Sequence, residues 1–121
     1  MIKILTIITL YFGVTFDAEA KSKHYEKYYQ KKDCESKGGI MEYRLPNKKR
    51  IDCLTEQEAI EHDFQKKVFE CLGQALYYGY ATGKDSVCAL IVKNKNSKEY
   101  RLLKDLEGKP LVLKRVYEIQ E

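Results

Sequence analysis

Four of the 121 residues are cysteines, and the compartment in which the chain folds decides what they form. A short apolar segment at the N-terminus indicates that compartment. Lys3 precedes an uncharged stretch over residues 4–16, and an Ala-Glu-Ala sequence at residues 18–20 places small side chains where a signal peptidase reads them. The stretch is shorter than the about 20 residues that a membrane-spanning helix needs. We therefore predict a signal peptide over residues 1–20, export to the periplasm or the medium, and no stable membrane span after processing.

Export would place the cysteines in an oxidising environment, where disulfides form. No Cys-x-x-Cys motif is present, and the even spacing of the four residues argues against a zinc site. Cys34 ends the first predicted helix, and Cys53 lies on a predicted hairpin beneath it, so we predict that these two are bridged. Cys71 and Cys88 occupy apolar positions of a predicted helix and strand, where buried thiols are common.

The composition is that of a folded domain, because 44% of the residues are hydrophobic and 33% are charged. We expect a basic Tyr- and Lys-rich leader over residues 21–33 and a domain over residues 34–121. Tyr25, Tyr28 and Tyr29 have helical spacing, so this leader is predicted to enter a helix. Interleaved basic and aromatic residues are also typical of nucleic-acid contact, and a solvated basic leader is the alternative.

Hydrophobic periodicity and turn residues divide the rest of the chain into elements. The strand over 87–93 is almost continuously apolar, which favours a central strand covered on both faces. The order is α-β-β-β-α-β-α-β, which predicts the α/β (α+β) class with a mixed sheet flanked by helices. The predicted helices cover 24–36, 68–82 and 98–106, and the predicted strands cover 40–45, 50–54, 59–64, 87–93 and 111–119.

Three carboxylates interrupt two of these strands. Glu61 and Asp63 are two residues apart, so they share one face of their strand. Asp52 lies on the preceding strand, and the short connection favours antiparallel pairing that brings it beside Glu61. Mg²⁺ binds through one or two carboxylates and several waters. The pattern therefore predicts a Mg²⁺ site formed by Asp52, Glu61 and Asp63, and a solvated acidic edge is the alternative.

These residues, with their surroundings, resemble the PD-(D/E)XK nuclease-like superfamily, in particular a branch of small exported bacterial proteins without assigned function. The resemblance covers about residues 34–92. It depends on an acidic residue in the second strand, an acidic motif in the third, and a Gly-Gln-Ala-Leu-Tyr-Tyr sequence on the following helix. It implies a restriction-endonuclease-like fold, a divalent-metal-dependent phosphodiesterase activity and nucleic acid as partner. The positive net charge of +4 agrees with a phosphate-bearing partner.

The resemblance also implies roles for single residues. Asp52 and Glu61 match the metal-binding carboxylates of the superfamily. Asp63 stands where the superfamily usually has a lysine, and either Lys66 or Lys67 would replace that positive charge.

Two further residues complete the candidate catalytic set, namely Glu42 on the first strand and Gln74 on the helix. His62 is interpreted as a packing histidine. Because Asp63 departs from the pattern, a catalytically inactive binding module of the same fold is the alternative function. A small disulfide-stapled domain with a structural role is a third hypothesis.

Overall fold

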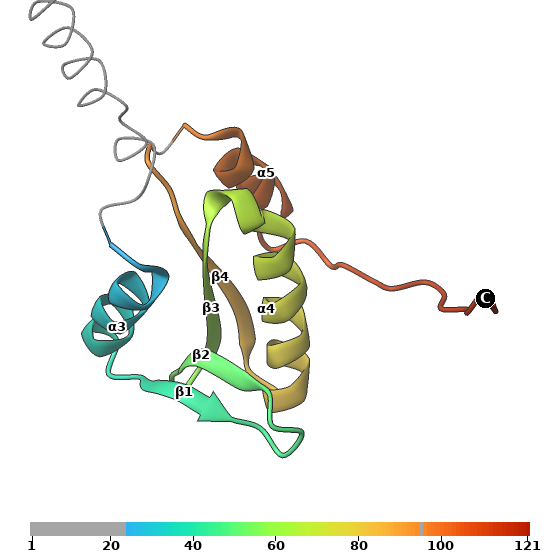
Figure 1. Cartoon of the computed structure of the whole chain (residues 1–121), viewed down its shortest axis with the longest axis horizontal. Coiled ribbons are helices and arrows are strands. Elements are labelled where there is room, and N and C mark those ends of the chain that lie inside the picture. Colours follow the sequence, from blue (N-terminus) through green and yellow to red (C-terminus); the bar gives the residue numbers. More distant parts are fainter. Residues whose placement is uncertain (1–23, 95) are drawn as a thin grey trace, which may run out of the picture.

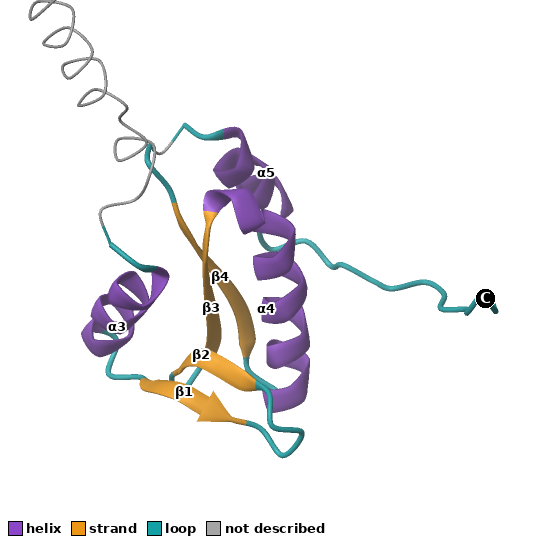
Figure 2. Cartoon of the chain, in the orientation of Figure 1, coloured by secondary structure: helices purple, strands orange, loops and turns teal. Residues whose placement is uncertain are grey.

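The protein is described by a computed structural model that covers residues 24–94 and 96–121 (Figure 1). One four-stranded mixed sheet in the order β1-β2-β3-β4 forms its centre. Helices α3 and α4 lie on opposite sides of β3, and α5 lies beside α4 (Figure 2). The elements are α3 (Glu26–Ser36), β1 (Ile40–Arg44), β2 (Arg50–Leu54), β3 (Glu58–Phe64), a 3-10 turn η1 (Gln65–Lys67), α4 (Val68–Thr82), β4 (Asp85–Ile91) and α5 (Lys98–Leu106).

These elements agree with the sequence-based expectation to within about two residues at each end, apart from the last strand. The hairpin between β1 and β2 turns at Asn47, whose side chain accepts a hydrogen bond from the Lys49 N–H. Helix α4 ends at Gly83, which has a φ of 69° in the left-handed region. This conformation suits glycine because it lacks a Cβ.

The sheet changes character across its width. β1, β2 and β3 form an antiparallel meander, whereas β4 pairs with β3 in parallel through the α4 crossover. The β3–β4 ladder runs without interruption from Glu58 to Phe64. The β2–β3 ladder contains only the pairs Cys53–Ile60 and Leu54–Ala59. The second and third strands therefore separate soon after the turn that joins them.

Two disulfides tie helices to the sheet. Cys34 of α3 is bonded to Cys53 of β2, as predicted. Cys71 of α4 is bonded to Cys88 of β4, so the interpretation of these two as thiols is wrong. Their apolar positions lie where α4 packs against β4. At such a contact two cysteine side chains are close enough to form a disulfide. Two disulfides are typical of proteins that fold in an oxidising compartment.

The C-terminal part of the fold differs from the expectation. Residues 111–119 form no strand, and they extend away from the body (Figure 1). β4 is an edge strand, because within the described residues it pairs only with β3. A strand that lacks one neighbour explains why the residues from Val87 to Ile91 are half-buried rather than buried. The prediction that the apolar run over 87–93 forms a central strand is therefore wrong.

The predicted leader and the predicted signal peptide fall partly or wholly outside the described residues. From Glu26 onward, the leader sequence belongs to α3, where the Gln30 side chain is buried against the sheet. Residues 1–20 lie outside the description. Among the described helices, none has the length and apolar character needed to cross a membrane.

Candidate functional site

The candidate site lies where β2 and β3 separate. In the antiparallel register set by Cys53 and Ile60, Asp52 and Glu61 would form the next pair. The ladder stops there, and side chains replace it. The Asp52 Oδ2 atom accepts a hydrogen bond of 2.8 Å from the His62 N–H, and the Glu61 carboxylate is hydrogen-bonded to the backbone of Asp52. The two carboxylates therefore occupy the space that backbone pairing would have filled.

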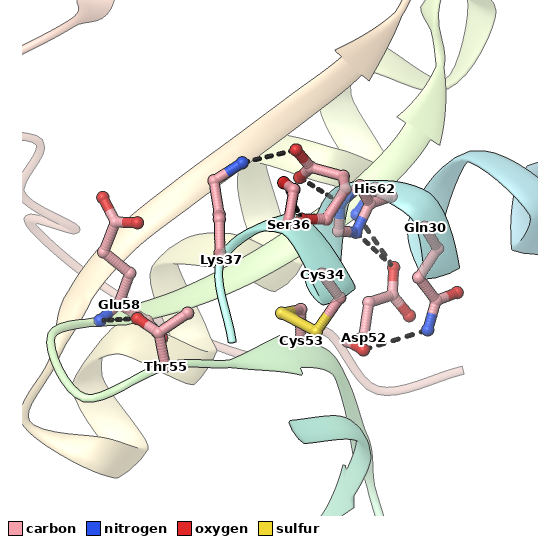
Figure 3. The surroundings of a disulfide bond; sticks show 10 residues. Gln30, Cys34, Ser36, Lys37, Asp52, Cys53, Thr55, Glu58 and His62 are labelled. Carbon is pink, nitrogen blue, oxygen red and sulfur yellow. Dashed lines mark hydrogen bonds and ion pairs between the residues drawn. A yellow bond between two sulfur atoms is a disulfide. The ribbon is translucent and has the colours of Figure 1, made fainter. Parts of the chain in front are cut away.

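Helix α3 approaches this opening with polar side chains (Figure 3). The His62 Nε2 atom lies 2.8 Å from the Asp33 Oδ2 atom, and the His62 ring is buried as predicted. Gln30 donates a hydrogen bond of 2.9 Å from its side-chain amide to the Asp52 carbonyl. Lys37 forms an ion pair with Asp33 on the outer side. These contacts, next to the Cys34–Cys53 disulfide, fix α3 over the opening.

Glu61 is the most perturbed carboxyl group of the site. It is only 6% exposed, and its Oε1 atom has no hydrogen-bond partner. Burial raises the pKa of Glu61 to about 8, and the negative charge of Asp52 adds to the effect. The group therefore holds a proton at neutral pH unless a cation compensates its charge.

Asp63 is in a similar state on the same strand. It is 5% exposed, and its Oδ2 atom also lacks a partner. Burial raises the pKa of Asp63 to about 7, and the charge of Glu26 and a hydrogen bond with it act in the same direction. The positive charge of Lys67 opposes this shift, so Lys67 lies within electrostatic reach.

The pKa shifts of the neighbouring carboxyl groups show which charges in the site act on one another. Burial raises the pKa of Asp52, although the His62 N–H stabilises its charged form. Burial also acts on Asp33, but hydrogen bonds from Lys37 and His62 prevail and lower its pKa. Glu26, Asp52, Glu61 and Asp63 influence one another through their charges, and we call these four residues the acidic cluster.

The remaining predicted site residues lie farther out. Glu42 of β1 forms an ion pair of 3.4 Å with Lys27, and its charge also raises the pKa of Asp52. Lys66 and Gln74 are exposed. Of the two candidate lysines, Lys67 is the one whose charge acts on Asp63.

Sequence reasoning missed three residues of α3 that contribute to the site, namely Glu26, Gln30 and Asp33. Their spacing of four and three residues places them on one face of the helix. Cys34 is next to this face, and its disulfide directs the face toward β2. That combination could have identified the inward side of α3. The tyrosines were a poor guide, since Tyr25 and Tyr28 are exposed.

The structure constrains what kind of cation the acidic cluster suits. Within residues 24–94 and 96–121, no three His, Cys, Asp or Glu side chains converge closely enough to enclose one ion. Glu61 and Asp63 nevertheless each leave one buried carboxylate oxygen unpartnered. Mg²⁺ is commonly held by one or two carboxylates with waters in the remaining positions. The donor set therefore fits a hydrated Mg²⁺ ion better than an ion held by protein groups alone.

Comparisons of the chain with protein-family models, with curated proteins and with solved structures gave no match.

Proposed function

We propose that the protein is an exported, divalent-metal-dependent phosphodiesterase that acts on nucleic acid at the acidic cluster. The observation that carries the proposal is the pair of unpartnered, buried oxygen atoms of Glu61 and Asp63. A buried polar atom without a hydrogen bond is costly, and a buried carboxylate is costlier unless it is paired with a positive charge. A bound divalent cation removes both penalties.

The arrangement of the elements supports the proposal. A helix, three antiparallel strands, a crossover helix and a parallel strand follow one another in the order that the PD-(D/E)XK resemblance implies. In that resemblance, the second and third strands carry the metal-binding carboxylates. The resemblance matches Asp52 and Glu61 to these carboxylates, and the two residues lie on either side of the opening between β2 and β3.

Each residue then has a role in the proposed site. Glu61 and Asp63 would hold the cation with their spare oxygens, and Asp52 would complete the carboxylate set. When bound, the cation lowers the pKa of a coordinated water and offsets charge on the phosphodiester. Lys67 would supply the positive charge that Asp63 cannot. The contacts from His62 and Gln30 would keep Asp52 in position.

The test measures cation binding and cleavage with the same variants. Titration calorimetry with Mg²⁺ and Mn²⁺ should show binding to the native protein, and oligonucleotide or plasmid cleavage should require the cation. Glu61→Gln should lose both. Glu56→Gln is the matched control, because Glu56 is exposed in the turn before β3, and it should retain both. Absence of cation binding in the native protein would overturn the proposal.

The second candidate function is a binding module of the same fold without catalysis. Asp63 favours it, because a carboxylate replaces the lysine that the resemblance implies at this position. Cation binding that depends on Glu61, without any cleavage, would select this candidate. Lys67→Ala separates the two further, since it should abolish cleavage only if Lys67 supplies the missing charge.

A further inference from the structure

The C-terminal tail, residues 110–121, has no part in the acidic cluster. All of its residues are exposed, including the large apolar side chains of Val112, Leu113 and Ile119, each more than 80% exposed. Residues with apolar side chains alternate with polar ones along part of it, and the Arg115 guanidinium lies over the Tyr117 ring at 4.7 Å. Residues two apart share a face in an extended chain. The tail therefore has the sequence pattern of a strand, but within the described residues it pairs with no strand of the sheet.

The free edge of β4 is the complementary feature. Within the described part of the chain, the seven residues of β4 pair only with β3, so the other edge offers N–H and C=O groups. Such edges pair readily with further strands. A groove of about 730 Å³ adjoins this edge, between α4, β4 and α5. Its apolar lining includes Leu72, Leu76, Val87, Leu103 and Leu111.

The tail does not return to the β4 edge of its own chain. Gly108 has a φ of 74°, and Pro110 follows it, so the chain leaves the groove in a fixed direction. Leu111 lines the near end of the groove, and the chain then extends away from the body (Figure 1). Residues 111–121 contain no Gly, Pro, Asn or Asp, the residues that reverse a chain.

We infer that the C-terminal tail of one copy pairs with β4 of a second copy and fills its groove, and that the exchange is reciprocal. Both copies then use the same two features, which is the condition for a closed two-fold dimer. Charge supports the match at one end of the groove. Glu58 and Asp85 line it at the start of β4, Lys104 is ion-paired with Glu107, and Lys109 lies where the tail begins. The tail carries Lys114 and Arg115, which match the acidic end.

The inward face of the tail follows from its alternation. One face of the extended tail carries Leu111, Leu113, Tyr117 and Ile119 with Arg115, and the other carries Val112 and Val116 with Lys114 and Glu118. The first face is the more apolar one. Only the first set should bury against the partner. Leu113→Lys and Val116→Lys are therefore a matched pair, because both place a lysine at an exposed apolar position of the tail.

The test is analytical ultracentrifugation of the oxidised protein over a range of concentrations. We expect a dimer whose dissociation constant rises at least tenfold in Leu113→Lys and changes less than threefold in Val116→Lys. Circular dichroism checks that both variants keep the fold. Hydrogen exchange should protect the tail amides together with the β4 amides that do not bond to β3, and only in the dimer.

Three results would overturn the inference. One is a monomer at all concentrations, with unprotected tail amides. Another is a monomer whose tail amides are protected, which would mean that the tail pairs within its own chain. The third is an equal effect of both lysine variants, which would indicate association through general hydrophobicity rather than through strand pairing.

Discussion

The two helices that cover β3 are held by different forces. Helix α3 is attached through polar contacts, with Gln30 and Asp33 bonded to β2 and β3. Helix α4 is attached through apolar packing, and its buried side includes Val68, Cys71, Ala75 and Tyr78. A disulfide ties each helix to the sheet. The disulfides are alike, but the surfaces they join are not.

The difference shows where the protein buries polar side chains. Apolar packing alone could hold α3, as it holds α4, at a lower desolvation cost. Instead, Gln30 of α3 and three consecutive residues of β3, namely Glu61, His62 and Asp63, are buried around the opening between β2 and β3. An arrangement that places costly groups together around partnerless oxygens is typical of a functional site. On the α4 side, the unfilled space is the surface groove beside β4.

The largest expected effect comes from removing one disulfide at a time. The two bridges span 19 and 17 residues, so the chain-entropy model gives each about 3 kcal/mol of stability. Denaturant unfolding of Cys34→Ser/Cys53→Ser and of Cys71→Ser/Cys88→Ser should therefore give similar losses. Cation affinity should fall more in the first variant, because that bridge holds α3 and its Glu26 over the acidic cluster, whereas the second bridge adjoins only the Glu61 backbone, opposite Cys88. An equal loss of affinity in both variants would erase the functional difference between the two sides.

A smaller effect should appear as a dependence of stability on pH. The pKa of Glu61 is about 8 in the folded protein, above its value of 4.5 in a model compound. The folded state therefore holds a proton that the unfolded state releases, and this contribution is complete below about pH 4.5 and lost as the pH rises through 8. Without divalent cations, we expect stability to fall on the order of 2 kcal/mol between pH 5 and 8.

Two variants assign this slope to the acidic cluster. Glu61→Gln cannot ionise, so its unfolding free energy should change less between pH 5 and 8, while Glu56→Gln should keep the native slope. Asp63 adds a slope of the same sign, because its pKa is also raised. The lowered pKa of Asp33 contributes only in more acidic solution. Urea unfolding in chelator-treated buffers measures the slope, and a native stability that rises toward pH 8 would contradict the assignment.

The smallest effect compares one glycine from each side. A methyl group on Gly39 would meet both sulfur atoms of the Cys34–Cys53 disulfide, at 2.5 and 2.8 Å. On Gly79 it would meet the Ser86 hydroxyl, which can rotate away, although the Ser86 Cβ atom remains at 2.9 Å. Overpacking typically costs about 1–3 kcal/mol. We expect Gly39→Ala to lower the free energy of unfolding by about 2 kcal/mol and Gly79→Ala by about 1 kcal/mol. Thermal unfolding measures both losses. The reverse order would show that the disulfide adjusts to the added methyl group more easily than the α4 crossover does.

Local sequence signals were sufficient for most of the fold. Hydrophobic periodicity located α4 and α5, and the Pro-Asn turn located the β1–β2 hairpin, because these features depend on residues close together in the sequence. The Cys34–Cys53 bridge followed from the same reasoning. The placement of Asp52 beside Glu61 at the strand opening was also accessible, since the short turn after β2 favours antiparallel pairing of the two strands.

The errors concern features that depend on distant parts of the chain. The run from Val87 to Ile91 is apolar on both faces, but no local signal tells that one edge is free. The pattern over 111–119 specifies a strand without specifying its partner. Glu26 joins the acidic cluster, and Asp33 reaches His62, only after the disulfide has oriented α3. The contribution of these residues is therefore tertiary.

The order of the cysteines along the chain has a consequence for oxidative folding. The first cysteine is bonded to the second and the third to the fourth, so the two covalent loops neither overlap nor interleave. A chain that emerges N-terminus first exposes Cys34 and Cys53 before Cys71 and Cys88, and consecutive oxidation then produces the native pairs directly. Such a chain reaches its native connectivity by order of appearance, without disulfide reshuffling.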